Sequence, residues 1–169
     1  MDIGQTRVVV AAKDNAGRAT FTDLPAVWHY NEPGVAQAAF FWEFRKPPML
    51  PAALGNVPND MSFPLLGASK FGLVCLPPRS AGKMDINTTL KGQEVAIDSG
   101  DPGLHQSNTV DIEVIISGKV DIGLEGGESR TLTPGMCLVM GGVMHVWKNH
   151  YDEPCVFAII LTGATPAEG

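Results

Sequence analysis

The stretch between Asn108 and Leu161 consists of short β-branched runs separated by glycine, proline and polar turn residues. The runs "TVDIEVIIS" and "VDIGL" lie on either side of Gly118, and "EGGE" then supplies a Gly-Gly hairpin turn into "SRTLT". Runs of this length with such boundaries are typical of antiparallel strands joined by tight turns. No helical period competes with that interpretation.

The first half of the chain indicates the same class. Thr6 to Lys13 and Arg18 to Leu24 flank the turn signal "DNAG" and predict a hairpin. Two more strands are predicted at Ala38 to Lys46 and Ser69 to Pro78, each stopped by prolines, whereas Arg79 to Gly103 fits no period and predicts a long loop. We therefore expect an all-β sandwich or barrel.

Length and charge narrow the functional classes. At 169 residues the chain is predicted to form one domain with its own core. Its formal net charge of -6 argues against a nucleic-acid partner, because that affinity depends on lysine and arginine neutralising phosphates. The longest apolar runs, Val35 to Trp42 and Cys155 to Leu161, are too short to cross a bilayer, so no membrane partner is expected.

The cysteines and the start of the chain indicate the compartment. Cys75, Cys137 and Cys155 are odd in number, widely spaced and set among apolar neighbours, which predicts reduced thiols. The opening "MDIGQTRVVV" has no basic cluster and no long apolar segment, so it does not predict a secretory signal. A cytoplasmic location is the expectation.

Two carboxylates interrupt an otherwise apolar strand in "TVDIEVIIS". Asp111 and Glu113 are two residues apart, so the strand period places both on one face. Burying a charge costs several kcal/mol unless a partner compensates. We therefore expect these acids to face a site.

Two histidines stand close to the same region of the sequence. His105 precedes the strand with the two acids, and His145 lies in "GGVMHVWKN" on the same strand face as Trp147. If the strands are neighbours or opposed, His105, Asp111 and His145 converge with the composition of a 2-His-1-carboxylate metal site. In the alternative, each histidine caps a turn or bonds a backbone carbonyl.

The two segments that carry these residues resemble the cupin motifs. "GLHQSNTVDIEVIISGKVDIGL" resembles the first, with His105 in the first-histidine position, Ser107 where a second histidine normally stands and Asp111 in the glutamate position. "PGMCLVMGGVMHVWKN" resembles the second, one residue shorter than the usual pattern and with Met140 in place of its proline. The residues that match the second motif are Gly135, Gly142, His145 and Asn149.

A narrower group of small cupins is similar over most of the chain. Its motifs read like "HRTDTVDYGIVLEGE" and "PGDVVVQRGTNHAWRN" followed by "DEPC", beside "HQSNTVD", "SGKV" and "DEPCVFAIIL" here. The resemblance implies a double-stranded β-helix, the cupin jelly-roll barrel, with an N-terminal β extension. We expect the extension at about residues 1–66, the barrel at about 67–162 and a flexible tail at 163–169.

The resemblance also implies a small site in the mouth of the barrel. His105, Asp111 and His145 would hold one divalent metal, Fe(II), Mn(II) or Zn(II), although Ser107 removes one ligand of the full set. In the metal-free alternative a histidine acts as general acid or base and Asp111 orients it. Ser107 and Trp147 are expected in the substrate pocket.

Glu113 is the departure from the narrower group, which carries glycine or alanine at this position. Two neighbouring carboxyls raise one pKa, which is how an acid or base active near neutral pH is made. The alternative is an outward residue paired with a lysine.

Three functions follow. The first is a small-molecule enzyme, of the natural-product type found in this group, that performs dehydration, isomerisation, cyclisation or decarboxylation with His105, Asp111, Glu113 and His145. The second is an Fe(II)-dependent dioxygenase, and the third is a barrel that binds a small ligand without catalysis. Small cupins commonly pair, so a homodimer is expected.

Overall fold

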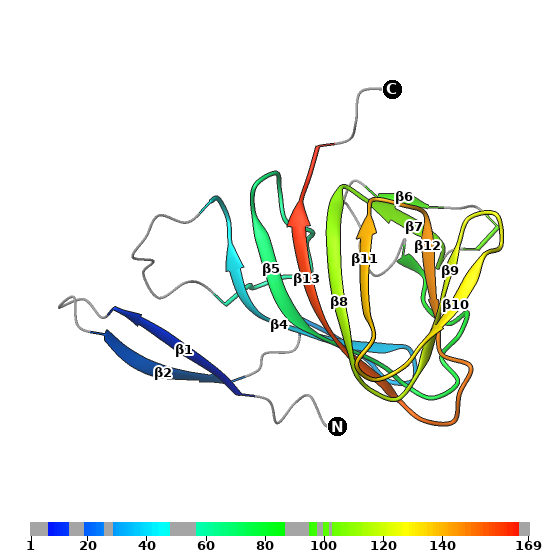
Figure 1. The fold of residues 1–169 in the computed structure, drawn as a ribbon, viewed down its shortest axis with the longest axis horizontal. Helices are drawn as coiled ribbons and strands as arrows, with labels where there is room; N and C mark the ends of the chain where they lie inside the picture. The colour runs from blue at the N-terminus through cyan, green and yellow to red at the C-terminus, as the bar shows by residue number, and fades with distance from the viewer. Residues whose placement is uncertain are drawn as a thin grey trace.

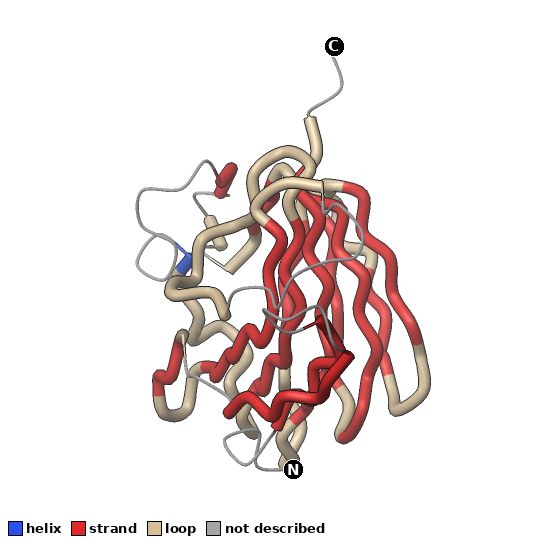
Figure 2. The backbone as a smooth tube through the Cα atoms, turned by 90° about the vertical axis from the view of Figure 1, so that its left-hand side faces the viewer, coloured by secondary structure: helices blue, strands red, loops and turns tan. Residues whose placement is uncertain are grey.

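The structure, a computed structural model, describes residues 7–13, 19–25, 29–47, 57–86, 95–97, 100–101 and 103–165. Strands and loops make up nearly all of this part of the chain (Figure 2). In chain order the strands are β1 (Arg7–Lys13), β2 (Ala19–Pro25), β3 (Tyr30–Glu32), β4 (Ala36–Phe44), β5 (Ser69–Leu76), β6 (Val95–Ile97), β7 (His105–Ser107), β8 (Thr109–Ser117), β9 (Val120–Leu124), β10 (Ser129–Leu132), β11 (Cys137–Gly141), β12 (His145–Lys148) and β13 (Cys155–Gly163).

Two antiparallel sheets form the body of the molecule (Figure 1). The larger has six strands in the order β11-β8-β13-β5-β4-β3, and the smaller has five in the order β10-β9-β12-β7-β6. Neighbours such as β8 and β13 are far apart in sequence, so long-range pairing closes the structure. This double sheet is the predicted all-β jelly roll.

The main core lies between the two sheets, and a smaller buried cluster of Ala39, Leu73, Cys75 and Val156 is separate from it. In β8 the residues Asp111, Glu113 and Ile115 are buried, while the intervening residues are exposed. Phe157 of β13 and Val120 of β9 are buried against the same interior. Strand period two therefore carries both acids of β8 into the barrel, as predicted.

The N-terminal region divides differently from the prediction. β1 and β2 pair with each other as the expected hairpin and form a sheet of their own. β4, however, pairs with β5 from Gln37 to Phe44, so the six-stranded sheet of the barrel already begins before residue 67. At the other end β13 continues to Gly163, one residue into the expected tail.

Outside the barrel, the six-stranded sheet carries a row of exposed apolar side chains. Ile112 on β8 is opposite Val139 of β11 on one side and Ile160 of β13 on the other, and Ile160 is in turn opposite Phe71 of β5. These four are 39–66% exposed. Apolar residues aligned across four strands are a feature of surfaces that associate.

Gly118 lies in the turn that joins β8 to β9, where the backbone of Pro154 packs closely against it. Its φ is +70°, and an added Cβ would lie 2.1 Å from the carbonyl oxygen of Pro154. Gly126 has a φ of +84° but open space around it. Both glycines have a backbone that L side chains rarely adopt, but only Gly118 also needs the close approach.

We expect Gly118→Ala to destabilise the fold much more than Gly126→Ala. The left-handed backbone costs each alanine about 1 kcal/mol, and the contact with Pro154 adds about 2 kcal/mol or more at Gly118 only. Urea denaturation of both variants measures the difference. If both variants lost the same free energy of unfolding, the turn at Gly118 would be able to move away from Pro154 at no cost.

Within the described residues, no helix has the length and apolar character needed to span a membrane.

Candidate active site

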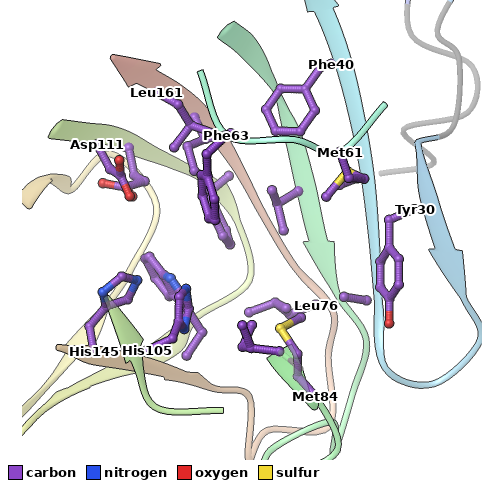
Figure 3. A pocket seen from close by; sticks show the side chains of 18 residues that line it. Tyr30, Phe40, Met61, Phe63, Leu76, Met84, His105, Asp111, His145 and Leu161 are labelled. Atoms are coloured by element: carbon purple, nitrogen blue, oxygen red, sulfur yellow. The ribbon is translucent and has the colours of Figure 1, made fainter. Parts of the chain in front are cut away.

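A cavity of about 120 Å³ lies between the two sheets. His105, Asp111 and His145 lie toward one end of it, and Tyr30, Met61 and Met84 lie toward the other (Figure 3). The cavity therefore has a polar end and an apolar end. Its remaining lining residues are Ala36, Ala38, Phe40, Phe63, Val74, Leu76, Ile86, Glu113, Trp147, Phe157, Ile159 and Leu161.

The two histidines come from neighbouring strands of the five-stranded sheet. His105 of β7 is the cross-strand partner of His145 of β12, and their ring centroids are 4.5 Å apart. Both side chains are buried. A cross-strand pair on one sheet face is thus what brings together two residues that are forty positions apart in the sequence.

Hydrogen bonds fix the tautomer of each imidazole. Nδ1 of His105 lies 3.0 Å from the carbonyl oxygen of Gly103, and Nδ1 of His145 lies 2.8 Å from that of Val143. A carbonyl only accepts, so each Nδ1 carries the proton and donates it. Each Nε2 of the neutral ring is left with a lone pair.

Burial also keeps both rings uncharged. It lowers the pKa of His105, and it lowers the pKa of His145 to about 4, with the neighbouring His105 adding to the effect. Both imidazoles are therefore neutral near pH 7, which is the form that accepts a proton.

The two carboxyls come from β8 in the opposite sheet. Asp111 is 5% exposed and Glu113 is fully buried. Oδ1 of Asp111 and both carboxyl oxygens of Glu113 have no hydrogen-bond partner. Buried polar atoms are almost always paired, so three such oxygens beside one cavity indicate a functional role.

The surroundings raise the pKa of both acids. Burial raises the pKa of Asp111 to about 6, against a hydrogen bond from Thr109 that lowers it. Burial, and then the charge of Asp111, raise the pKa of Glu113 to about 8. At neutral pH Glu113 therefore holds a proton, while Asp111 is mostly ionised.

The donor atoms of this site fit a divalent metal only in part. The free Nε2 atoms of His105 and His145, each ring held by a carbonyl, are the usual form of metal-binding histidines. Among the described residues, however, no three His, Cys, Asp or Glu side chains are grouped closely enough to hold an ion. Metal binding by His105, Asp111 and His145 stays a prediction.

The structure brings most of the predicted site residues together. His105, Asp111, Glu113, His145 and Trp147 all line the cavity. The indole of Trp147 stacks on the ring of Phe157 with centroids 4.6 Å apart, so it forms a fixed wall.

Ser107 does not belong to the cavity, contrary to the prediction. Its side chain is buried, and its hydroxyl lies 2.7 Å from Oγ1 of Thr109. It is not among the described residues that line this cavity.

One wall of the cavity was not predicted from the sequence. Met61 and Phe63 come from a proline-rich segment, and Tyr30 comes from the short strand β3. These residues follow no helical or strand period from which their place in the cavity wall could be predicted. Methionine and aromatic side chains among prolines are the only signal, and it is a weak one.

Two side chains, Lys70 and His29, make the polar contacts that hold this proline-rich segment over the cavity. Nζ of Lys70, a buried cation, donates to Oδ1 of Asp60 at 3.0 Å and to Oγ of Ser62 at 3.3 Å. His29 accepts a hydrogen bond from the amide of Phe40 at Nδ1, so its Nε2 donates to the carbonyl of Pro58. These bonds flank Met61 and fix the apolar wall.

Comparisons with known proteins are partial in sequence. No family model matches the chain. It is 36% identical over 50 residues to phomopsin biosynthesis cluster protein C′ of Diaporthe leptostromiformis, covering 30% of this chain and 26% of that protein. It is 39% identical over 49 residues to oryzines biosynthesis cluster protein J of Aspergillus oryzae, covering 29% and 27%. The matches thus span about a quarter of these relatives.

Solved structures are similar in fold. A 7S globulin of Momordica charantia superposes with a TM-score of 0.51 at 11% identity, over 83% of this chain and 33% of that one. A Cupin 2 conserved barrel domain protein of Salinispora arenicola gives a TM-score of 0.43 at 13% identity, over 76% of each chain. The superposition on the 7S globulin agrees with the double sheet observed here and shows that the two proteins share a fold.

Proposed function

We propose that this chain is an enzyme of secondary metabolism that acts on a small organic molecule by proton transfer. The observation that carries the proposal is one cavity lined by two neutral imidazoles and two buried, unpartnered carboxyls. The partial similarity to two fungal biosynthesis-cluster proteins supports the type of pathway.

The site contains a base and an acid in the protonation states that proton transfer requires. An imidazole Nε2 of His145 or His105 accepts a proton from a carbon next to a carbonyl. Glu113 donates its proton to the oxygen that becomes an enol or leaves as water. Asp111 stabilises the imidazolium that forms. Dehydration, isomerisation and cyclisation use this pair of steps, whereas a decarboxylation breaks a C–C bond to carbon dioxide and needs only the acid, which protonates the enolate that is left.

The two roles coexist because burial favours the uncharged form of each group, which is the free base of histidine and the protonated acid of Glu113. Burial keeps the histidine pKa low and the Glu113 pKa high, so base and acid are both ready near pH 7. The apolar remainder of the cavity excludes water, which strengthens each electrostatic interaction.

The test begins with the organism and ends with the purified chain. Deleting the gene should make one metabolite accumulate, and the purified chain should convert that metabolite without a redox cofactor. In D₂O an isomerised or decarboxylated product should carry solvent deuterium on carbon, whereas a dehydrated product should lack the hydrogen that the base removes. The genes beside this one would name the pathway and narrow the metabolite.

Other outcomes would favour the alternatives. Oxygen consumption with stoichiometric iron in anaerobically purified protein would indicate the dioxygenase. Tight binding of the accumulated metabolite with no product would indicate a binding barrel. Either result would overturn the proton-transfer enzyme.

We also propose a homodimer that forms through the exposed apolar row of the six-stranded sheet. Light scattering after size-exclusion chromatography should give the mass of two chains. Ile112→Lys should shift the mass to that of one chain, because it places a charge at the centre of the row. A wild-type monomer at micromolar concentration would contradict this proposal.

A further inference from the structure

The polar end of the cavity is rich in electron pairs and poor in positive charge. It presents the Nε2 lone pairs of His105 and His145, Oδ1 of Asp111 and both oxygens of Glu113. None of the described residues that line the cavity is a lysine or an arginine. The nearest strand neighbours of the two acids are apolar as well: Met140 and Leu161 are opposite Asp111, and Leu138 and Ile159 are opposite Glu113.

Such an arrangement is unusual for buried acids. Elsewhere in this chain the buried Glu43 has cations beside it, with Arg45 at 2.7 Å and Lys70 at 3.9 Å. A buried carboxylate without a partner is costly, and natural sequences keep one where a bound group completes it. The partner of Asp111 and Glu113 is therefore to be sought in the ligand.

The walls of the cavity define the rest of that ligand. Phe40, Trp147 and Phe157 supply aromatic side chains, and Met61 and Met84 lie toward the far end. Aromatic faces attract a cation and also accommodate an apolar body. The ligand that fits is small, apolar at one end and a hydrogen-bond donor with positive charge at the other.

We infer that the substrate carries a protonated amine, and that Asp111 and Glu113 bind it at the polar end of the cavity. An ammonium group has up to three N–H donors, and Oδ1 of Asp111 and the carbonyl oxygen of Glu113 are acceptors without partners. This inference rests on the proposed function, since it names the substrate class of the same site.

The binding experiment uses three probes of the same shape. Phenethylammonium, 2-phenylethanol and phenylacetate are titrated by calorimetry into the chain after treatment with EDTA. Phenethylammonium should bind about 10- to 100-fold more tightly than 2-phenylethanol, because hydrogen bonds between charged groups are stronger than those between neutral groups. Phenylacetate should bind most weakly, since it adds a like charge.

Two variants test whether Asp111 causes the preference for phenethylammonium over 2-phenylethanol. Asp111→Asn should remove most of the advantage of ammonium over the alcohol while leaving binding of the alcohol similar. Glu128→Gln, which removes an exposed charge from the hairpin turn after β9, should leave the advantage intact. Adding Zn(II), Mn(II) or Fe(II) instead of the amine tests whether a metal is the cation that completes the acids.

The outcomes separate this inference from the proposed function. Equal affinity for ammonium and alcohol, or tight metal binding that prevents ammonium binding, would overturn the amine as the substrate class. Turnover of a neutral metabolite with solvent deuterium incorporation would then leave the proton-transfer function standing. A clear ammonium preference without turnover of any metabolite would support the amine site and count against the enzyme.

Discussion

Replacing His105 or His145 by glutamine is expected to lower kcat/KM by about 100-fold or more. General base catalysis by a placed imidazole contributes roughly 10²- to 10⁴-fold, and a glutamine amide cannot accept the proton. Glutamine is similar in size, so the cross-strand pair between β7 and β12 should persist. The rates are measured with the metabolite that accumulates in the deletion strain.

The pH profile distinguishes a base from a structural residue. Activity needs a neutral imidazole and a protonated Glu113, so kcat/KM should rise through the acidic pKa of the histidine and fall near pH 8. Glu113→Gln should lower the rate and remove the alkaline fall. If both histidine variants keep wild-type rates and profiles, the imidazoles are structural and the mechanism is wrong.

The polar end of the site could be predicted from the sequence because strand periodicity determines side-chain direction. Asp111 and Glu113 alternate with valine and isoleucine, so a single assignment of the inner face placed both acids. The motif resemblance then located His105 and His145 relative to them. Glu113 depended least on the resemblance, since it is a departure from the narrower group.

The apolar end could not be predicted because no local pattern encodes it. Met61 and Phe63 reach the cavity through tertiary contacts, the bonds of Lys70 to Asp60 and Ser62. A buried lysine in β5 gives no indication of which distant segment it will hold.

The stability of the chain should fall as the pH rises from about 7 to about 9, above the range in which the histidines titrate, and Glu113 should be the main cause. In the folded chain Glu113 keeps its proton up to about pH 8, whereas its ordinary pKa is 4.5. Between these values the folded state binds more protons than the unfolded state, so the free energy of unfolding decreases with increasing pH. The full shift corresponds to roughly 5 kcal/mol, a large part of the usual 5–15 kcal/mol of a domain.

Ionisation of Asp111 also lowers the free energy of unfolding as the pH rises, but over a lower pH range. Its pKa rises from 3.8 to about 6, so its part of the loss is complete near neutral pH. The decrease above pH 7 should therefore belong to Glu113. A substitution that cannot ionise separates the two contributions.

Glu113→Gln should flatten the stability profile above pH 7, because the amide has no proton to lose. Urea denaturation at intervals between about pH 5 and about pH 9 measures the free energy of unfolding of both chains. Near pH 5 the variant should be the less stable one, since its buried amide lacks partners, and near pH 9 it should be the more stable one. Glu128→Gln should follow the wild-type curve. A wild-type profile that stays level above pH 7 would mean that the Glu113 carboxyl finds water or a partner in solution, and the acid assigned to the mechanism would lose its basis.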